Sequence, residues 1–283
     1  MPSQRDIRIR INASKNIRQI TRAMQFVAAS KLRRAQESTL AARPYSDLID
    51  EILADLASVL GADEHPLLSR REEGKRLIIL VTSDRGLAGP LNTNAVRFVS
   101  KEIIEHAGDL EMVTVGRKGR DAMRRARVPI IAHFAGFGDR PSVDDILPLA
   151  RLISDEYEAG TYNEVDIVFT RFVSTLVQRA DMVQLLPIRP SSDTHGVPGS
   201  QFIFEPAPEV VLDELLPRYL VTRLYQTALE STASFFSSQM VAMKNATENA
   251  SELIDDLTLS YNKARQANIT SELIEIASGA QAR

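Results

Sequence analysis

Residues 236–268 read FSSQMVAMKNATENASELIDDLTLSYNKARQAN, and small or apolar side chains recur there alternately four and three residues apart. The seam consists of Phe236, Met240, Met243, Thr247, Ala250, Ile254, Leu257, Tyr261, Ala264 and Asn268. This alternation places side chains on one stripe of a helix, as in a coiled coil. Several members of the seam are small, so we expect a partner helix to approach closely.

The seam belongs to a long segment without helix breakers. Residues 218–278 contain no Pro and no Gly, and neither do residues 3–43. A helix over the later segment would extend roughly 90 Å at about 1.5 Å per residue. Such a helix needs a partner along its length, and the N-terminal helix can supply one. We therefore predict an antiparallel coiled coil of the two chain ends, and we expect this rod to be the working part.

The N-terminal helix has its own apolar stripe. We place its seam at Ile7, Ile11, Ile17, Ile20, Met24 and Val27. The next positions would be Lys31 and Arg34, where the seam ends in charge. Either another element holds the helix there, or these two cations extend into solvent. Pro44 is expected to interrupt the helix, and an amphipathic continuation reaches about Leu60.

The middle of the chain alternates between short apolar runs and helical segments. The predicted strands cover residues 76–82, 110–115, 128–134, 165–172 and 177–188, and the predicted helices lie near 94–106, 118–126 and 143–158. This rhythm predicts a mostly parallel sheet with helices on both faces. Residues 190–208, rich in Pro, Gly and Ser, lead back to the last helix. The expected fold class is α/β, with an N-terminal shaft helix over 1–60, an inserted domain over 61–208 and a C-terminal shaft helix over 209–283.

Composition limits the function. The net charge of −3 over 283 residues gives no bulk electrostatic reason to bind nucleic acid. Without Cys, disulfides and thiolate metal sites are excluded. The longest aliphatic run, Leu77–Val81, is far shorter than the ~20 residues that span a bilayer. The Arg-rich N-terminus is not followed by the apolar segment of a secretory signal.

Charge is unevenly distributed along the chain. Residues 1–43 carry ten Lys or Arg and two acids, a net of +8, whereas residues 209–283 carry a net of −4. The simplest interpretation is complementarity between two paired helices. A transit peptide or a nucleic-acid-binding arm are alternatives. The coiled-coil pattern disfavours the first, and the scarcity of aromatic residues for base stacking disfavours the second.

One loop could hold a ligand. The segment SDRGLAGPLNTN (Ser83–Asn94) follows a strand and opens a helix, which is where open α/β sheets bind ligands. Gly86 and Gly89 could admit a phosphate, but no GxGxxG and no P-loop Lys follow. The GRKG segment, residues 116–119, is an equally weak signal for phosphate binding. The simpler reading is a tight turn with a structural Asp84–Arg85 pair.

No other catalytic constellation is present. The four His residues lack metal-binding spacing, and the adjacent acids at 144–145 and 255–256 point in different directions on their helices. No nucleophile elbow occurs. We therefore expect no catalytic, cofactor or metal site.

Longer motifs carry a resemblance. Residues 17–34 read IRQITRAMQFVAASKLRR and residues 261–280 read YNKARQANITSELIEIASGA, with SDRGLAGPLNTN between them. In this order the motifs resemble the γ subunit of F-type ATP synthases over essentially the whole chain. The resemblance implies a coiled-coil shaft with a Rossmann-like α/β domain at its base. It also implies a central rotor that performs no bond chemistry and needs no cofactor, and that transmits torque between an ion-driven c ring and a catalytic α/β hexamer. It further implies that proton transport is thereby coupled to ATP synthesis or hydrolysis.

The resemblance also implies residue roles. The expected hexamer contacts are Arg8, Arg10, Met24, Arg33, Arg34, Gln239, Arg265, Gln266 and Thr270. Some bacterial relatives carry Arg where Gln239 stands. The expected apolar bearing comprises Ile274, Ile276 and Ala277, and the expected c-ring foot comprises Arg43, Tyr45, Phe204 and Glu205. The regulatory Cys pair of the chloroplast type is absent.

The expected partners are three α and three β subunits, an ε subunit and the c ring, with no nucleic acid. The expected location is the cytoplasmic face of the bacterial plasma membrane, reached through the complex. Two functions from other classes stay open at this point. They are a nucleotide-binding enzyme built on Ser83–Asn94 and a nucleic-acid adaptor built on the basic first helix.

Overall fold

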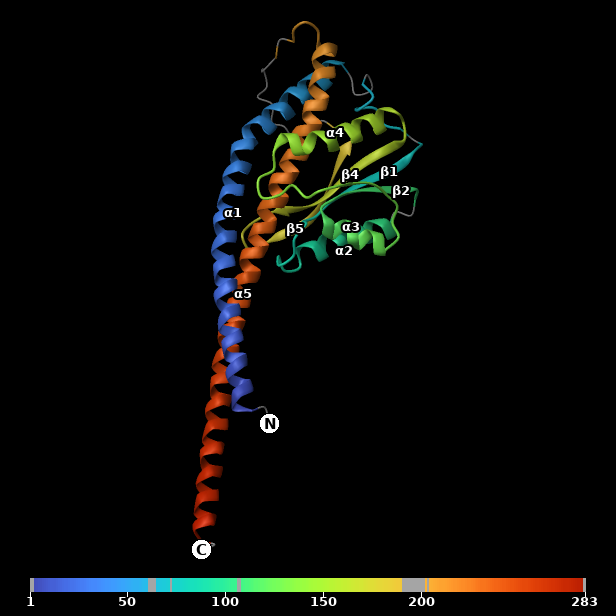
Figure 1. Ribbon diagram of the computed structural model, residues 1–283. Helices are drawn as coiled ribbons and strands as arrows, with labels where there is room; N and C mark the ends of the chain where they lie inside the picture. The colour runs from blue at the N-terminus through green and yellow to red at the C-terminus, as the bar shows by residue number, and fades with distance from the viewer. Residues whose placement is uncertain are drawn as a thin grey trace. The chain divides into compact units, whose positions relative to one another are not determined.

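The computed structural model describes residues 3–60, 65–71, 73–105, 108–189, 202 and 204–281. Its elements are α1 (Gln4–Leu60), β1 (Lys75–Val81), α2 (Leu91–Glu105), β2 (Leu110–Val115), α3 (Arg117–Arg125), β3 (Ile130–Phe134), α4 (Val143–Glu158), β4 (Tyr162–Phe172), β5 (Gln178–Leu186) and α5 (Pro208–Gln281). They form two compact units: unit 1 comprises residues 1–28 and 239–283, and unit 2 comprises residues 29–238. Both α1 and α5 contribute residues to each unit (Figure 1).

Unit 2 is built around a five-stranded sheet in the order β3-β2-β1-β4-β5. The pairs β1–β2, β1–β4 and β2–β3 are parallel, whereas β4 and β5 form an antiparallel hairpin at one edge. The predicted mostly parallel sheet is therefore confirmed. Strand order reverses between β1 and β4, which makes the carboxyl end of β1 the topological switch point.

Two apolar layers cover the sheet, because successive side chains of β1 point to opposite faces. Ile78 and Leu80 pack with Val99 of α2 and Met123 of α3. Leu77 and Ile79 pack on the other face with residues of α4 and with the unit 2 parts of α1 and α5. Figure 1 shows α2 and α3 on one side of the sheet and α4 on the other. The expected helices on both faces are confirmed.

The first helix does not stop at Pro44, contrary to our prediction. Proline removes one backbone donor and costs ~3 kcal/mol or more in a helix interior. On its C-terminal side, Ile49, Leu53 and Leu56 of α1 are buried in the core of unit 2. This burial outweighs the local cost, since packing supplies most of a helix's stability in a protein. Pro217 lies inside α5 in the same way.

Unit 1 is a pair of antiparallel helices. Ile7 and Ile11 of α1 cluster with Ile254 of α5, and Thr21 shares a 2.8 Å hydrogen bond between hydroxyls with Thr247. Positions that ascend along α1 therefore meet positions that descend along α5, which confirms the antiparallel pairing. The seam predicted for α5 is confirmed as far as Ala264: its members in unit 1 are buried or half-buried, whereas Asn268 is exposed.

The seam predicted for α1 is wrong after Ile11. Its buried positions are Ile7, Ile11, Ser14, Thr21, Ala28, Leu32 and Ala35. Ile17, Ile20 and Val27 are instead more than half exposed. Both stripes have coiled-coil spacing, but only the one with small residues at its centre lets the helices approach closely. The true seam continues through Leu32 and Ala35, so it does not end in charge at Lys31 and Arg34.

Candidate functional site

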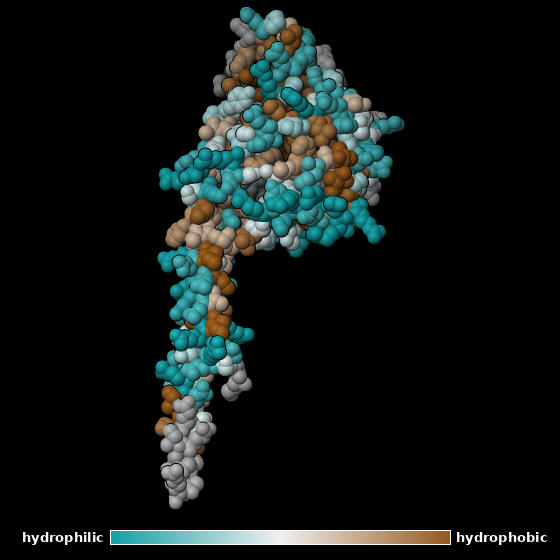
Figure 2. All heavy atoms as spheres, viewed as in Figure 1, coloured by the Kyte–Doolittle hydropathy of each residue, from teal (hydrophilic) through white to brown (hydrophobic). Residues whose placement is uncertain are grey.

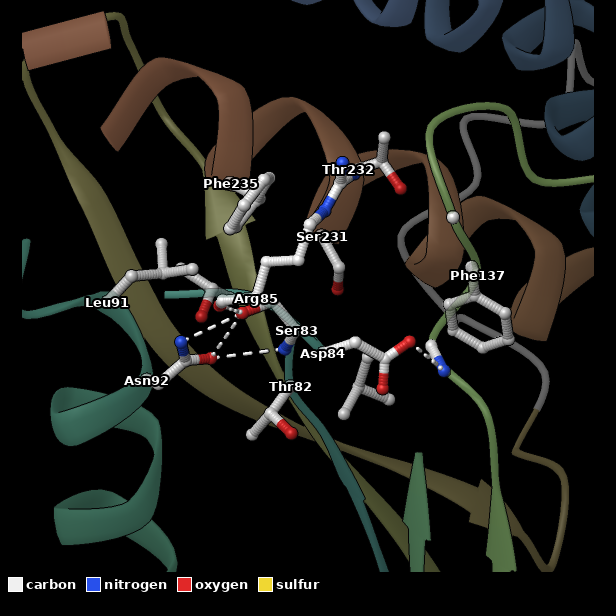
Figure 3. A pocket seen from close by; sticks show the side chains of 14 residues that line it. Thr82, Ser83, Asp84, Arg85, Leu91, Asn92, Phe137, Ser231, Thr232 and Phe235 are labelled. Atoms are coloured by element: carbon white, nitrogen blue, oxygen red, sulfur yellow. Dashed lines mark hydrogen bonds between the residues drawn. The ribbon is translucent and has the colours of Figure 1, made fainter. Parts of the chain in front are cut away.

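The loop at the switch point joins the end of β1 to the start of α2. Asn92 of α2 accepts a hydrogen bond from the backbone N–H of Ser83 at 3.1 Å and donates one to the Ser83 hydroxyl at 2.8 Å. A cavity of about 60 Å³ lies here, lined by this loop and by Ser231, Thr232 and Phe235 of α5 (Figure 3). Its volume suits a few water molecules and is far below the ~300–1,000 Å³ of cofactor pockets.

Asp84 supplies the anion at this switch point. Its carboxylate accepts a hydrogen bond from the backbone N–H of Arg117 at 2.9 Å and another from that of Gly136 at 3.0 Å. The first of these donors opens α3, where a bound phosphate would otherwise find its partners. The side chain of Arg117 lies 3.7 Å from the same carboxylate. Asp84 therefore joins the loops after β2 and β3 and occupies the natural place of an anionic ligand.

The expected Asp84–Arg85 pair is wrong. Arg85 instead forms an ion pair with Asp139, which also accepts a 2.5 Å hydrogen bond from Lys31 of α1. Burial opposes ionisation of Asp139, but the hydrogen bonds from Lys31 and Arg85 outweigh it and lower its pKa. The guanidinium of Arg85 also lies over the ring of Phe235. These partners are far apart in the sequence, so local spacing could not reveal them.

The GRKG segment serves packing. Gly116 has a φ of +89°, and a Cβ there would collide with the carbonyl oxygen of Thr82. The backbone N–H of Gly119 donates a 2.8 Å hydrogen bond to the Thr82 hydroxyl. Both glycines thus let α3 lie directly against the end of β1. Neither holds a ligand in this arrangement.

One buried ion pair lies inside the sheet. The Arg76 guanidinium of β1 contacts the Asp166 carboxylate of β4 at 2.6 Å, and Asp166 is only 2% exposed. Burial raises the pKa of Asp166 to about 6, although the nearby guanidinium acts in the opposite direction. The pair has no access to the switch-point cavity, so we assign it to structure.

The described residues contain no group of three or more His, Cys, Asp or Glu positioned to hold a metal ion. Among the described helices, none is long and apolar enough to cross a membrane.

The predicted hexamer contacts fall on both units. In unit 1, Arg8, Arg10, Arg265, Gln266 and Thr270 are exposed, whereas Met24 and Gln239 are half-buried. In unit 2, Arg33 and Arg34 are exposed, and Arg33 donates a 3.1 Å hydrogen bond to Glu37 one turn later. All of these side chains except Met24 and Gln239 point largely into solvent in the isolated chain.

The predicted bearing lies at the end of α5. Ile274 is 59% exposed. The side chains of Ile276 and Ala277 lie outside the described residues, so their part of the prediction stays open.

The predicted foot residues belong to unit 2. Arg43, Tyr45 and Glu205 are exposed. Phe204 is half-buried against the apolar core on the α4 face, with its ring centroid 6.4 Å from that of Phe202. Arg43 and Tyr45 lie two residues apart on α1, so their side chains point to different sides of the helix, and Phe204 and Glu205 lie shortly before α5.

Sequence reasoning missed an apolar surface on unit 1. Ile9, Ile17, Ile20, Phe26 and Val27 of α1 are each more than half exposed. We name these five residues the apolar stripe. Figure 2 shows apolar side chains interspersed with polar ones along this part of the molecule. Part of the signal was present in the sequence: Ile17, Ile20 and Val27 had been assigned to the seam, whereas Ile9 and Phe26 had not.

Comparisons with known proteins agree along the whole chain. A family model described as ATP synthase matches residues 3–282. A protein named ATP synthase gamma chain from Pelotomaculum thermopropionicum is 44% identical over 282 residues, which cover 100% of this chain and 99% of the relative. Its namesake from Roseiflexus castenholzii is 47% identical over 290 residues, with the same coverage.

Solved structures share the fold. A chain of the Euglena gracilis mitochondrial ATP synthase, in a structure titled OSCP/F1/c-ring, aligns with a TM-score of 0.68 at 18% identity and covers 99% of this chain and 94% of its own. A chain of the Tetrahymena thermophila central stalk and c-ring structure aligns with a TM-score of 0.62 at 21% identity, covering 80% of this chain and 99% of its own. With the sequence matches, these findings show that the chain belongs to the family of ATP synthase gamma chains, the central-stalk subunits of F-type ATP synthases.

Proposed function

We propose that this chain is the rotor itself: it transmits torque between a c ring and a hexamer of three α and three β subunits, and it catalyses no reaction of its own. The observation that carries this proposal is the apolar stripe on unit 1. Large apolar side chains exposed in series mark a surface that another protein covers. A helix pair that exposes large apolar side chains along its length is suited to lie inside an assembly that surrounds it.

Continuous helices suit the transmission of torque. Both α1 and α5 continue through residues of both units without a break. Backbone hydrogen bonds link successive turns of a helix, so a rotation applied to one turn is passed to the next. From the resemblance of the terminal motifs, we assign the contacts with α and β to Arg8, Arg10, Met24, Arg33, Arg34, Gln239, Arg265, Gln266 and Thr270.

The ends of the shaft take different partners in this proposal. Ile274, Ile276 and Ala277 form the apolar bearing within the hexamer. Arg43, Tyr45, Phe204 and Glu205 form the foot on the c ring, where an ε subunit also binds. The chain would then lie at the cytoplasmic face of a bacterial plasma membrane, attached through its complex.

The decisive experiment is native mass spectrometry of the tagged chain produced together with its α, β and ε subunits. The expected result is one copy of this chain with three α, three β and one ε. ATP hydrolysis by α and β should also become cooperative only when this chain is present. A lone monomer under these conditions, or equal multisite turnover without the chain, contradicts the rotor function.

A second experiment tests individual contacts. Arg33→Glu with Arg34→Glu should lower ATP synthesis by the assembled complex while changing the unfolding free energy of the chain by less than about 1 kcal/mol, since both side chains are exposed. Arg140→Glu with Arg151→Glu, at two other exposed positions, makes the same change in net charge and serves as control. Normal synthesis in the first variant would assign its arginines to solvent.

A further inference from the structure

A dense basic cluster lies on α3 and the turn after it. Residues 117–127 read RKGRDAMRRAR, a net of +5 within a chain whose net charge is −3. We name its cations the basic patch: Arg117, Lys118, Arg120, Arg124, Arg125 and Arg127. Gly119 and Met123 attach this helix to the sheet, so the cations lie on its outer side, and all but Arg120 are exposed. Figure 2 shows mainly hydrophilic residues along this side of unit 2.

The chain itself provides little negative charge here. Arg117 lies 3.7 Å from Asp84, and Arg120 lies 2.9 Å from Asp121. In the described part of the chain, Lys118, Arg124, Arg125 and Arg127 form no ion pair at such distances. The Arg120 hydrogen bond lowers the pKa of Asp121, and the more distant Arg125 and Arg124 add to the effect. The Asp121 carboxylate is thus the single negative charge on α3, and it is shared by Arg120, Arg124 and Arg125.

Helix stability does not explain the patch. Cations in the last turn of a helix favour its dipole, which accounts for Arg124 and Arg125. Arg117 and Lys118 lie in the first turn, where a positive charge opposes the dipole, and α3 itself has no acidic residue there, so that Asp84 alone among the residues that the structure describes offsets these two cations. Arg120 and Arg124 are also four residues apart, a spacing at which like charges destabilise a helix. An anionic partner outside the chain would offset these unfavourable interactions by forming ion pairs with the cations.

The chemistry of the patch narrows the partner. Residues 117–127 expose no large apolar side chain. A membrane-surface helix needs apolar side chains to insert, and a single-strand binder needs aromatic ones for stacking. Five of the six cations are arginines, whose planar guanidinium groups bind carboxylates and phosphates in a bidentate way. Because the whole chain has a net charge of −3 and so no bulk attraction to nucleic acid, carboxylates presented by a protein are favoured.

The position of the patch also favours a protein partner over a membrane. This positional argument rests on the proposed function. Phe204 of the proposed c-ring foot packs on the α4 face of the sheet. Met123 of α3 packs on the opposite face. The patch is therefore separated by the sheet from the residues assigned to the membrane side. We propose that the basic patch is a docking surface for an acidic segment of a protein partner.

The test measures binding of an oligoglutamate peptide to the full chain at low salt. Lys118→Glu with Arg125→Glu removes two unpaired cations on one stripe, one at each end of α3, so their effects on the helix dipole oppose each other. The control is Arg140→Glu with Arg151→Glu, which changes the net charge equally. Phosphatidylserine vesicles and a short DNA duplex serve as competing anions, and circular dichroism verifies that each variant is folded.

We expect the wild-type chain to bind the peptide, the patch variant to bind about tenfold more weakly, and the control to be unchanged. Binding should weaken with added salt, because the contacts are exposed ion pairs. Equal loss in the control, no binding by wild type, or tighter binding to vesicles or duplex than to peptide overturns the proposal. The assay needs no α or β subunits, so its failure leaves the mass-spectrometry result for the rotor function untouched.

Discussion

The two units differ in how they bury their apolar residues. In unit 2, Leu77, Ile79 and Leu80 are completely buried between two helical layers. In unit 1, buried residues with large apolar side chains, such as Ile7 and Ile254, remain 4% and 7% exposed and belong to a single thin seam. Two helices alone have no interior beyond that seam. Unit 2 therefore carries its own fold, whereas unit 1 depends on what surrounds it.

The largest expected effect is in unit 2. Gly116→Ala places a Cβ against the Thr82 carbonyl at a φ of +89°, where an L-residue is strained. We expect a loss of more than about 3 kcal/mol in unfolding free energy, measured by urea denaturation. Gly108→Ala is the matched control, since a Cβ there meets nothing within 4 Å. Equal stability of the two variants would show that α3 does not lie directly on β1.

The buried carboxylate of unit 2 predicts a pH dependence. Burial raises the pKa of Asp166 to about 6 in the folded chain, against its ordinary value of 3.8. The stabilising contribution of a group with a raised pKa is fully present below about pH 4 and is lost as pH rises through 6. The unfolding free energy of wild type should therefore fall relative to that of Asp166→Asn by up to about 3 kcal/mol between pH 4 and 7. A difference that is constant over this range contradicts the prediction.

In unit 1 the seam can be tested by overpacking. Ala250 is 7% exposed, and Ala250→Leu should force the helices apart at a cost of about 1–3 kcal/mol. Hydrogen exchange should accelerate in residues 3–28 and 239–264 and stay unchanged in the sheet of unit 2. Leu253→Ala, at a position that is 49% exposed, is the control. Unchanged exchange in unit 1 would refute the seam.

The smallest effect distinguishes the two stripes of α1. Ile11→Ala removes a side chain from the seam and should cost about 2 kcal/mol, the low end for a buried Ile, because the thin seam can close around the gap. Ile20→Ala, at a position that is 59% exposed, should cost less than about 0.5 kcal/mol in the isolated chain. Thermal unfolding of the two variants measures the difference. In the assembled complex we expect the order of the two effects on rotor function to reverse, if the apolar stripe faces the partner as we propose.

Element type and order followed from the sequence, because hydrophobic period and chain breakers are local properties. The strand at 110–115 and the helix at 143–158 have the predicted bounds. The helix through Pro44 was missed, because the burial that compensates for it comes from the sheet domain. Asp84 was placed in the right loop but with the wrong partner, since Arg117 and Gly136 reach it from two later loops.

By itself the sequence determined the coiled coil of α5, the mostly parallel sheet and the family, because each produces a long periodic or ordered pattern of residues. Only the tertiary structure decided which stripe of α1 became the seam. Both stripes have the required spacing, and the choice depends on which one allows Thr21 to approach Thr247 closely. The stripe left outside is the surface on which we propose that the rotor meets its partners.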